Sequence, residues 1–187
     1  MEFETVGHRV DEEKIKADTS EDLAAVLAVL KASNPRKKVK GLVIGSDLVV
    51  DLKEELIGKP KDKEQAKEFL RKLSGQTHRV LTGIAVYNTQ EDEGRMSVCQ
   101  TKVRMKNLDE EIIEEYVNTF NVLDKGGGYS IKYQLKGFGS LVKEIEGSYT
   151  NVLGLPLEYL ENLLKEFEVE TVRNWRGKCK KETGYDY

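Results

Sequence analysis

Helical periodicity marks two segments in the first half of the chain. Thr19 precedes the apolar run Leu23–Leu30, and this pattern predicts a capped helix. The helix should end before Asn34-Pro35, because proline restricts the backbone of the residue that precedes it. Asp62 begins a second segment of the same kind, Lys63–Leu73, in which apolar residues recur at helical spacing.

Strand patterns lie between and after these helices. Gly41–Val50 is almost continuously apolar and rich in β-branched residues, which is typical of a buried strand. Val80–Tyr87 and Met96–Met105 are separated by a polar turn region, and this arrangement favours an antiparallel hairpin. The passage from Gly41 to Tyr87 is long enough for a crossover connection. We therefore expect a mixed α/β fold.

The second half of the chain continues with shorter elements. Asp109–Phe120 predicts a helix, Gly126–Gly128 breaks the chain, and Gly139–Ile145 fits either a strand or a short helix. A last helix is expected from Pro156 to Phe167, because proline suits a first helical turn. These elements predict one domain over residues 1–170. The tail 171–187 is polar and basic, and we interpret it as a loose end or a partner-docking arm.

Composition narrows the classes of protein that this chain can represent. The 187 residues are 39% hydrophobic and 34% charged, with a net charge of −3, so nothing attracts the whole molecule to nucleic acid or to an anionic membrane. The longest apolar run falls far short of the ~20 residues that span a bilayer. Cys99 and Cys179 match no zinc or redox spacing, which fits a reducing cytoplasm, with a structural disulfide as the alternative.

Asp47 is the first candidate for chemistry because it interrupts an apolar strand. A buried, ionised carboxylate is costly unless it is paired, bound to a metal or open to a cleft. The small residues Gly45 and Ser46 beside it let another group approach the backbone. One interpretation makes Asp47 a general base for water or a ligand of a divalent metal. The other makes it a structural residue that is hydrogen-bonded to a neighbouring loop.

Two loops carry cations that suit a phosphate site. Lys59 stands between a glycine and a proline, which restrict where its side chain points, and Lys125 precedes three glycines whose N–H groups can cradle an anion. Both lysines can also be plain turn residues. His8 and His78 have no spaced partners for a metal site, and we interpret His78 as a capping or loop histidine.

Short motifs follow one another over about residues 10–165 in an order that carries more information than any one of them. They are Val10–Glu13, Lys31-Ala32, Val43–Val50, Ile57–Pro60, Leu73–His78 with Thr82-Gly83, Thr101–Val103, Asp124–Ile131 and Ile145–Leu157. This order resembles the Maf family of nucleoside triphosphate pyrophosphatases, which is distantly similar to the inosine triphosphatases.

The resemblance implies an α/β fold, with two lobes around a long, mixed, twisted sheet flanked by helices and a nucleotide cleft between the lobes. It implies hydrolysis of a nucleoside triphosphate to the monophosphate and pyrophosphate with a divalent metal, Mg²⁺ or Mn²⁺. The expected substrates are pyrimidine nucleotides (dTTP or UTP) or modified nucleotides, removed in a house-cleaning role. A homodimer in the cytoplasm is a further expectation from the family.

The family's functional residues carry over to specific positions. Asp47 resembles the catalytic acidic residue that activates the attacking water, and Glu12 resembles the acidic partner that helps to hold metal or water. Lys31 and Lys59 resemble lysines that bind the triphosphate. Physical chemistry agrees, because charge that develops on phosphoryl oxygens needs cations and the attacking water needs a base.

Three features differ from the family pattern. The family's opening strand and its Ser-x-Ser-Pro-Arg-Arg phosphate loop do not occur in this sequence, so we expect the domain to lack them. Leu48 follows Asp47, where the family usually has a Thr or Gln that helps to select the base. After Tyr129–Ile131, either Lys132 or Gln134 takes the place of the family's substrate-binding Gln.

Three hypotheses follow from these observations. The first is a Maf-like pyrophosphatase, and the second is a Maf-like nucleotide-binding or regulatory protein without turnover. The third is nucleic-acid binding through Arg36–Lys40 and the basic tail, which the near-neutral net charge argues against.

Overall fold

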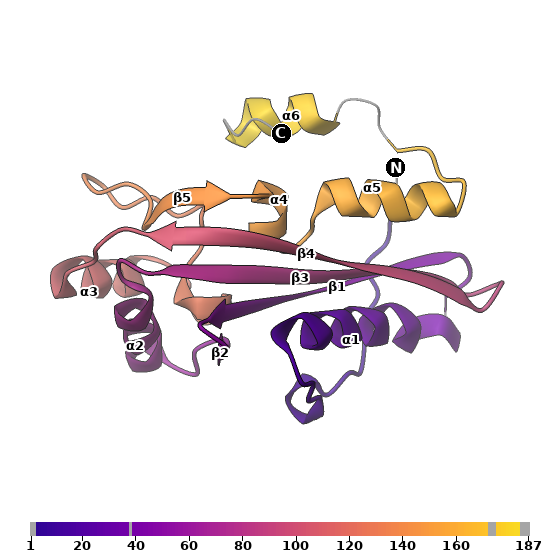
Figure 1. The fold of residues 1–187 in the computed structure, drawn as a ribbon, viewed down its shortest axis with the longest axis horizontal. Coiled ribbons are helices and arrows are strands. Elements are labelled where there is room, and N and C mark those ends of the chain that lie inside the picture. The colour runs from indigo at the N-terminus through magenta and orange to yellow at the C-terminus, as the bar shows by residue number, and fades with distance from the viewer. Residues whose placement is uncertain (1–2, 38, 172–174, 184–187) are drawn as a thin grey trace.

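An antiparallel sheet of five strands, in the order β2-β1-β3-β4-β5, forms the centre of the molecule (Figure 1). The computed structural model describes residues 3–37, 39–171 and 175–183. The strands are β1 (Leu42–Leu52), β2 (Glu55–Ile57), β3 (Thr77–Asn88), β4 (Glu93–Met105) and β5 (Val142–Glu146). The α/β class and the hairpin of β3 and β4 are confirmed.

Helices flank this sheet at both of its ends. Within the described ranges the longer helices are α1 (Ser20–Ser33), α2 (Lys63–Leu73), α3 (Glu110–Thr119), α5 (Leu157–Glu166) and α6 (Trp175–Thr183), with the short helix α4 at Tyr149–Val152. The same ranges contain three short 3₁₀ turns, η1 (Glu12–Lys14), η2 (Asn34–Lys37) and η3 (Gly126–Gly128). In Figure 1, α1 and α5 lie at one end of the sheet, and α2 and α3 lie at the other.

Local capping explains where several helices begin. The side chains of Thr19, Asp62 and Asp109 each accept a hydrogen bond from the backbone N–H three residues later, at the starts of α1, α2 and α3. Such caps satisfy N–H groups that have no partner within the helix. The first two starts agree with the sequence prediction, and α3 begins one residue after its predicted start at Asp109.

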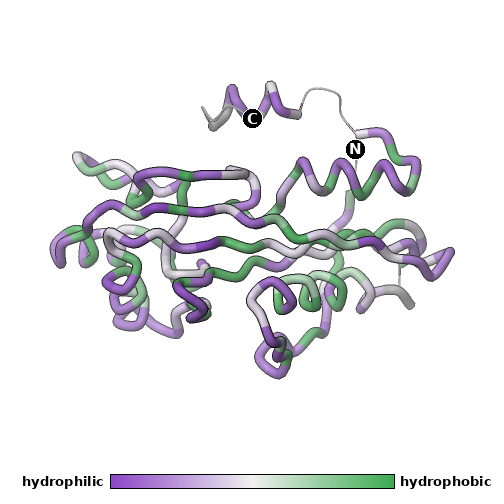
Figure 2. The backbone as a smooth tube through the Cα atoms, viewed as in Figure 1, coloured by the Kyte–Doolittle hydropathy of each residue, from purple (hydrophilic) through white to green (hydrophobic). Residues whose placement is uncertain are grey.

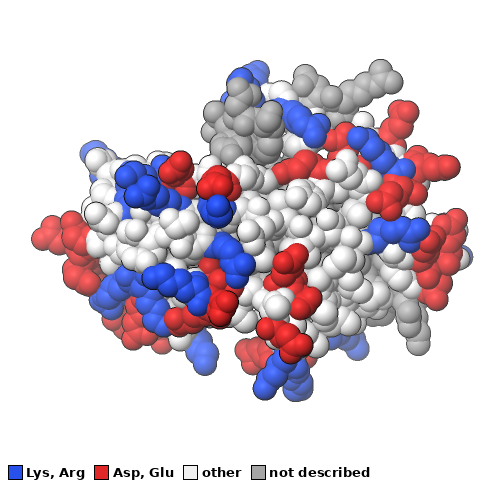
Figure 3. Space-filling model, viewed as in Figure 1, with Lys and Arg blue, Asp and Glu red and all other residues white. Residues whose placement is uncertain are grey.

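The two faces of the sheet bury different helices, because successive side chains of a strand point to opposite faces. Ala85 packs against Ala28 of α1 on one face. On the other face, Ile84 and Val86 pack against Leu163 of α5. A larger core surrounds Val50, Val80 and Val103 and includes buried residues of α2 and α3. Figure 2 shows these apolar segments along the inner strands, and Figure 3 shows charges of both signs interspersed over the surface in view.

Two expectations need correction, and one open alternative is decided. The sheet is antiparallel in every described pair rather than mixed, because the short strand β2 reverses the chain before α2 and β3 then pairs antiparallel with β1. His78 is not a capping or loop histidine but a buried residue of β3. The segment Gly139–Ile145, left open between strand and helix, contributes strand β5.

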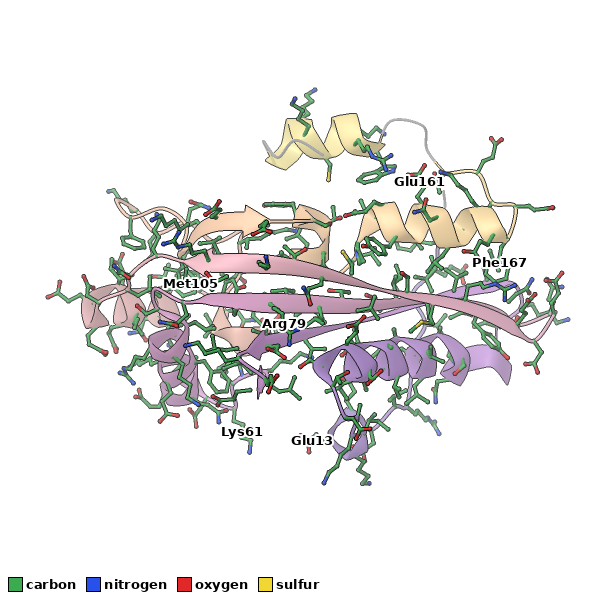
Figure 4. The ribbon with its side chains drawn as sticks, viewed as in Figure 1. Glu13, Lys61, Arg79, Met105, Glu161 and Phe167 are labelled. Carbon is green, nitrogen blue, oxygen red and sulfur yellow. The ribbon has the colours of Figure 1, made fainter. Side chains whose placement is uncertain are left out.

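Part of the C-terminal tail is folded onto the domain. Helix α6 contacts α5 through Glu161, which accepts hydrogen bonds from Trp175 Nε1 at 3.0 Å and from Arg176 at 3.1 Å (Figure 4). Residues 172–174 and 184–187 of the predicted tail lie outside the described residues, as does Lys38 of the basic run. Among the described helices, none is long and apolar enough to cross a membrane.

Candidate active site

Helix α1 lies very close to the sheet, and this contact positions Lys31, a charged residue of the site. A Cβ atom at Gly83 would lie 2.0 Å from the carbonyl oxygen of Ala24, and one at Gly45 would lie 2.4 Å from that of Ala28. No side chain fits at such distances, so glycine lets the helix backbone rest on β1 and β3. The expectation that Gly45 lets another group approach the strand backbone is confirmed, because helix α1 occupies that place.

A buried carboxylate anchors the start of the same helix. Asp51 is 1% exposed and accepts hydrogen bonds from the Ser20 hydroxyl at the beginning of α1, from Arg79 at 2.9 Å and from the backbone N–H of Glu54 at 3.1 Å. Figure 4 labels Arg79 on β3. Because its charge is fully paired, Asp51 joins α1, β1 and β3 rather than offering a reactive group.

Lys31, near the end of α1, joins the two acidic residues of the site. Its Nζ lies 2.5 Å from Asp47 Oδ1 on β1 and 2.7 Å from Glu12 Oε1 in η1. His8 Nε2 lies 3.9 Å from the same Glu12 oxygen. The side chains of Lys31 and Asp47 are only 13% and 12% exposed, so solvent screens this pair weakly.

The three charges have different protonation behaviour. Burial is the largest influence on Asp47 and raises its pKa, although Lys31 and the charge of Lys59 act in the opposite direction. Burial also acts to raise the pKa of Glu12, but the hydrogen bond and charge of Lys31 outweigh it and lower that pKa. Burial alone would lower the pKa of Lys31, but its bonds to Asp47 and Glu12 raise it. Asp47 is therefore the carboxylate that takes up a proton more readily.

A cleft of about 1060 Å³ opens beside this cluster. Its wall includes residues from segments that are far apart in the sequence, and the site residues predicted from the sequence that line it are Glu12, Asp47, Leu48, Lys59, Lys125 and Lys132. The ammonium group of Lys59 is close enough to influence the pKa values of both Glu12 and Asp47. The cleft thus combines acidic groups with several cations.

The edge of β1 supplies part of this wall. Within the described chain, only Val50–Leu52 of β1 pair with β2, and the preceding four residues, 46–49, all line the cleft. Asp47 and Leu48 point to opposite faces of the sheet because they are consecutive in a strand. A Cβ at Gly126 would lie 3.4 Å from Leu48 Cδ2, so Leu48 faces the glycine turn while Asp47 faces α1.

Two loops that carry lysines meet at the cleft. Gly127 and Gly128 both have a φ of 71°, a left-handed conformation that glycine adopts without strain. The N–H of Gly127 donates to the carbonyl oxygen of Gly58 at 3.0 Å, which fixes the η3 turn against the residue before Lys59. Lys125 precedes the turn and pairs with Asp124 at 2.8 Å.

The remaining candidates divide clearly. Lys31 is not part of the cleft wall but contacts Glu12 and Asp47, which are. Lys132 lines the cleft, whereas Gln134 is exposed and lies outside its wall. Ser46, considered only for its size, donates its hydroxyl towards the carbonyl oxygens of Gly154 at 2.8 Å and Gly83 at 3.0 Å. Ser46 also lines the cleft, and the sequence signal for this role is its position in an apolar strand beside Asp47.

A divalent cation can be tested against the donor atoms present. Among the described residues there is no group of three or more His, Cys, Asp or Glu side chains arranged to hold a metal. Mg²⁺, however, is usually bound by one or two carboxylates together with substrate phosphates and water. Glu12 and Asp47 contact the same nitrogen, Lys31 Nζ, and both line the cleft, so these two carboxylates fit that mode of binding.

Comparisons with known proteins find a matching family model and several similar proteins. The family model described as Maf-like protein matches residues 1–167. A dTTP/UTP pyrophosphatase of Acetivibrio thermocellus is 41% identical over 181 residues, which cover 92% of this chain and 88% of that protein. One from Geotalea uraniireducens is 42% identical, with 84% and 80% covered. One from Caldanaerobacter subterraneus is 38% identical, with 99% and 84% covered.

Proposed function

The chain belongs to the Maf-like protein family, and we propose that it hydrolyses nucleoside triphosphates to the monophosphate and pyrophosphate. The observation that carries this proposal is the meeting of Asp47, Glu12 and Lys59 in one cleft. The expected substrates are the pyrimidine nucleotides dTTP and UTP, because similar proteins bear the name dTTP/UTP pyrophosphatase.

Asp47 is the proposed general base. The attacking water must lose a proton as it adds to phosphorus, and a carboxylate accepts a proton more readily when its pKa is raised towards the working pH. Burial raises the pKa of Asp47, while Lys31 keeps the ionised form accessible by pairing with it. Lys31 thus orients the base and limits how far its proton affinity rises.

The cations are proposed to bind the triphosphate. Lys59 and Lys125 stand on the two loops that meet through Gly127 and Gly58, and Lys132 lies on the same cleft wall. Fixed positive charges stabilise phosphoryl oxygens most where charge increases during the reaction. Lys132, rather than Gln134, is the residue that we assign to the substrate-binding position of the family.

Glu12 and Asp47 would hold a divalent cation, Mg²⁺ or Mn²⁺, together with phosphate oxygens of the substrate. Such a cation supplies charge neutralisation and Lewis acidity when it is bound. The proposed division of work gives Glu12 the main share of metal binding, because Lys31 lowers the pKa of Glu12 and keeps it ionised.

The test is pyrophosphate release from a panel of nucleoside triphosphates, with and without added MgCl₂ or MnCl₂. We expect metal-dependent release that is fastest with dTTP or UTP and is abolished by Asp47→Asn, with the fold checked by thermal unfolding. Binding of nucleotides without any release would support the alternative, a nucleotide-binding protein without turnover. No release from any nucleotide by the wild-type chain would refute the proposed activity.

A further inference from the structure

A buried pair of polar rings lies beneath the glycine turn of the cleft. His78 on β3 is 2% exposed, and Tyr129, the residue after η3, is 6% exposed. His78 Nε2 lies 2.7 Å from Tyr129 Oη, and the rings meet edge to face with centroids 5.6 Å apart. Tyr129 also lines the cleft, so the pair connects the interior of the sheet with the site.

The direction of this hydrogen bond follows from the other polar atoms of the pair. Burial lowers the pKa of His78 to about 4 and raises the pKa of Tyr129 far above its ordinary value, so the imidazole is neutral and the phenol protonated. His78 Nδ1 has no hydrogen-bond partner within the described parts of the chain. If the Tyr129 hydroxyl donates to Nε2, only the Nδ1–H is left unpaired. The reverse arrangement leaves both the Nδ1 lone pair and the hydroxyl hydrogen unpaired, so Tyr129 is the donor.

Stability alone does not account for a histidine at this position. A buried donor without a partner costs free energy, and an apolar side chain at position 78 would carry no such cost. The surroundings are apolar, since Val80 and Val103 of the same core lie on the neighbouring strand positions. What the histidine provides instead is an acceptor for one specific hydroxyl.

Tyr129 transmits this contact to the loops of the cleft. A Cβ at Gly127 would lie 3.3 Å from two carbons of the Tyr129 ring, so the ring packs directly beneath the turn. The N–H of Gly127 is bonded in turn to the carbonyl oxygen of Gly58, next to Lys59. A displacement of the Tyr129 ring would therefore displace the turn and the loop that carries Lys59.

We propose that His78 and Tyr129 are positioning residues that hold the η3 turn against the Lys59 loop, so that both loops face the triphosphate. The inference rests on the proposed function for the identity of the anion. Neither residue is assigned contact with the reacting atoms. The pair fixes the spacing of cations that bind the triphosphate, and misplacement of such groups by about 1 Å can cost about 100-fold in rate.

The experiment uses the full chain and three variants. Tyr129→Phe removes only the hydroxyl, and His78→Leu/Tyr129→Phe removes both polar groups and leaves an apolar pair. His78→Gln retains a polar group that can reach the hydroxyl. Binding of inorganic tripolyphosphate in MgCl₂ is measured by calorimetry, pyrophosphate release from dTTP is measured alongside, and thermal unfolding reports the fold. Tyr159→Phe on α5, which lies outside the cleft wall, is the matched control.

We expect Tyr129→Phe and the double variant to bind tripolyphosphate about tenfold more weakly than wild type, equivalent to about 1.4 kcal/mol. The double variant should unfold at or above the wild-type temperature, because it contains no unpaired donor. His78→Gln should bind tripolyphosphate as tightly as wild type, because glutamine can still accept from the Tyr129 hydroxyl, and Tyr159→Phe should leave binding unchanged. A purely structural role predicts the opposite split, in which stability falls and binding by the folded protein does not.

Unchanged tripolyphosphate binding in the folded double variant would overturn the inference, and so would a wild-type chain that does not bind tripolyphosphate. Weakened binding in the variants supports the pair even if no nucleotide is hydrolysed. The absence of hydrolysis would contradict the proposed function and not the positioning role of the pair. Failure of the inference and failure of the proposed function are therefore distinguishable.

Discussion

The ammonium nitrogen of Lys31 lies 2.5 Å from Asp47 Oδ1 and contacts Glu12 as well. One cation from α1 therefore holds two carboxylates that would otherwise repel each other. Removal of either acidic partner leaves Lys31 with the other, whereas removal of Lys31 leaves two acidic side chains facing each other. This asymmetry makes Lys31 the most informative residue of the site to change.

Lys31→Met should reduce kcat/KM for pyrophosphate release by about 100-fold, because Asp47 loses the cation that orients it and misplacement of a catalytic group by about 1 Å can cost that much in rate. It should also move the acidic limb of the pH–rate profile to higher pH. Lys31 lowers the pKa of Asp47, so without it the base becomes protonated at a higher pH and activity is lost earlier on acidification.

Glu12→Gln provides the matched comparison. The charge of Glu12 raises the pKa of Asp47, so its removal should move the acidic limb in the opposite direction, to lower pH. Limbs that move the same way in both variants would contradict Asp47 as the group that titrates. The pH–rate profiles are measured at saturating metal.

Gly83→Ala tests how α1 is placed. The new Cβ would lie 2.0 Å from the Ala24 carbonyl oxygen, so α1 must move away from the sheet. We expect a loss of about 1–3 kcal/mol of unfolding free energy, as for other overpacked sites. Pyrophosphate release should fall as well, because Lys31 moves with α1 away from Asp47.

Urea unfolding and pyrophosphate release are the measurements for this variant. The control is Gly7→Ala, because a Cβ at Gly7 would have nothing within 4 Å. Equal stability of Gly83→Ala and Gly7→Ala would show that the close contact of α1 with the sheet is not needed.

The sequence predicts elements whose signals are local and misses contacts that depend on pairing. The caps at Thr19 and Asp62 lie within three residues of the N–H groups that they satisfy, so they were visible in the sequence. The antiparallel register of β1 with β3 was not, because it follows from the reversal at β2, a strand of three residues without an apolar pattern.

The candidate site shows the same limit. Asp47 stood out because it interrupts an apolar strand, but its contact with Lys31 depends on the backbone approach of α1 at Gly45 and Gly83. The loop or capping interpretation of His78 is wrong because the strand pattern predicts a start at Val80, whereas β3 begins at Thr77. The alternation of the strand nevertheless places His78 on the same face as Val80, inside the core.

Leu48→Thr should change which nucleobase the enzyme prefers in its substrate. Leu48 presents an apolar side chain between the glycine turn and Gly154, where a Cβ would lie 3.9 Å from Leu48 Cδ1. If the base lies against Leu48, the 5-methyl group of thymine gains an apolar contact that uracil lacks. We expect the ratio of kcat/KM for dTTP to that for dUTP to fall by about tenfold in Leu48→Thr, the lower limit for one methyl-sized group.

The same assays on Leu48→Met give the control, because methionine keeps an apolar side chain of similar volume. The ratio should then stay near the wild-type value. A ratio that is unchanged in Leu48→Thr would place the base away from Leu48.

His78 should make the stability of the protein depend on pH between about 6.5 and about 4. An unfolded histidine has a pKa near ~6.5, whereas burial lowers the pKa of His78 in the folded protein to about 4. Between these values only the unfolded chain binds the proton, so stability is full above the upper value and falls as the pH decreases. The difference in pKa corresponds to about 3 kcal/mol over the whole window.

The measurement is the free energy of urea unfolding at a series of pH values for wild type and His78→Leu/Tyr129→Phe. The carboxylates and His8 are present in both proteins, so the difference between the two curves isolates His78. That difference should change steadily in favour of the double variant as the pH is lowered through the window. Parallel curves would show that His78 takes up its proton in the folded protein as easily as in the unfolded chain, which would contradict its burial as a neutral acceptor for Tyr129.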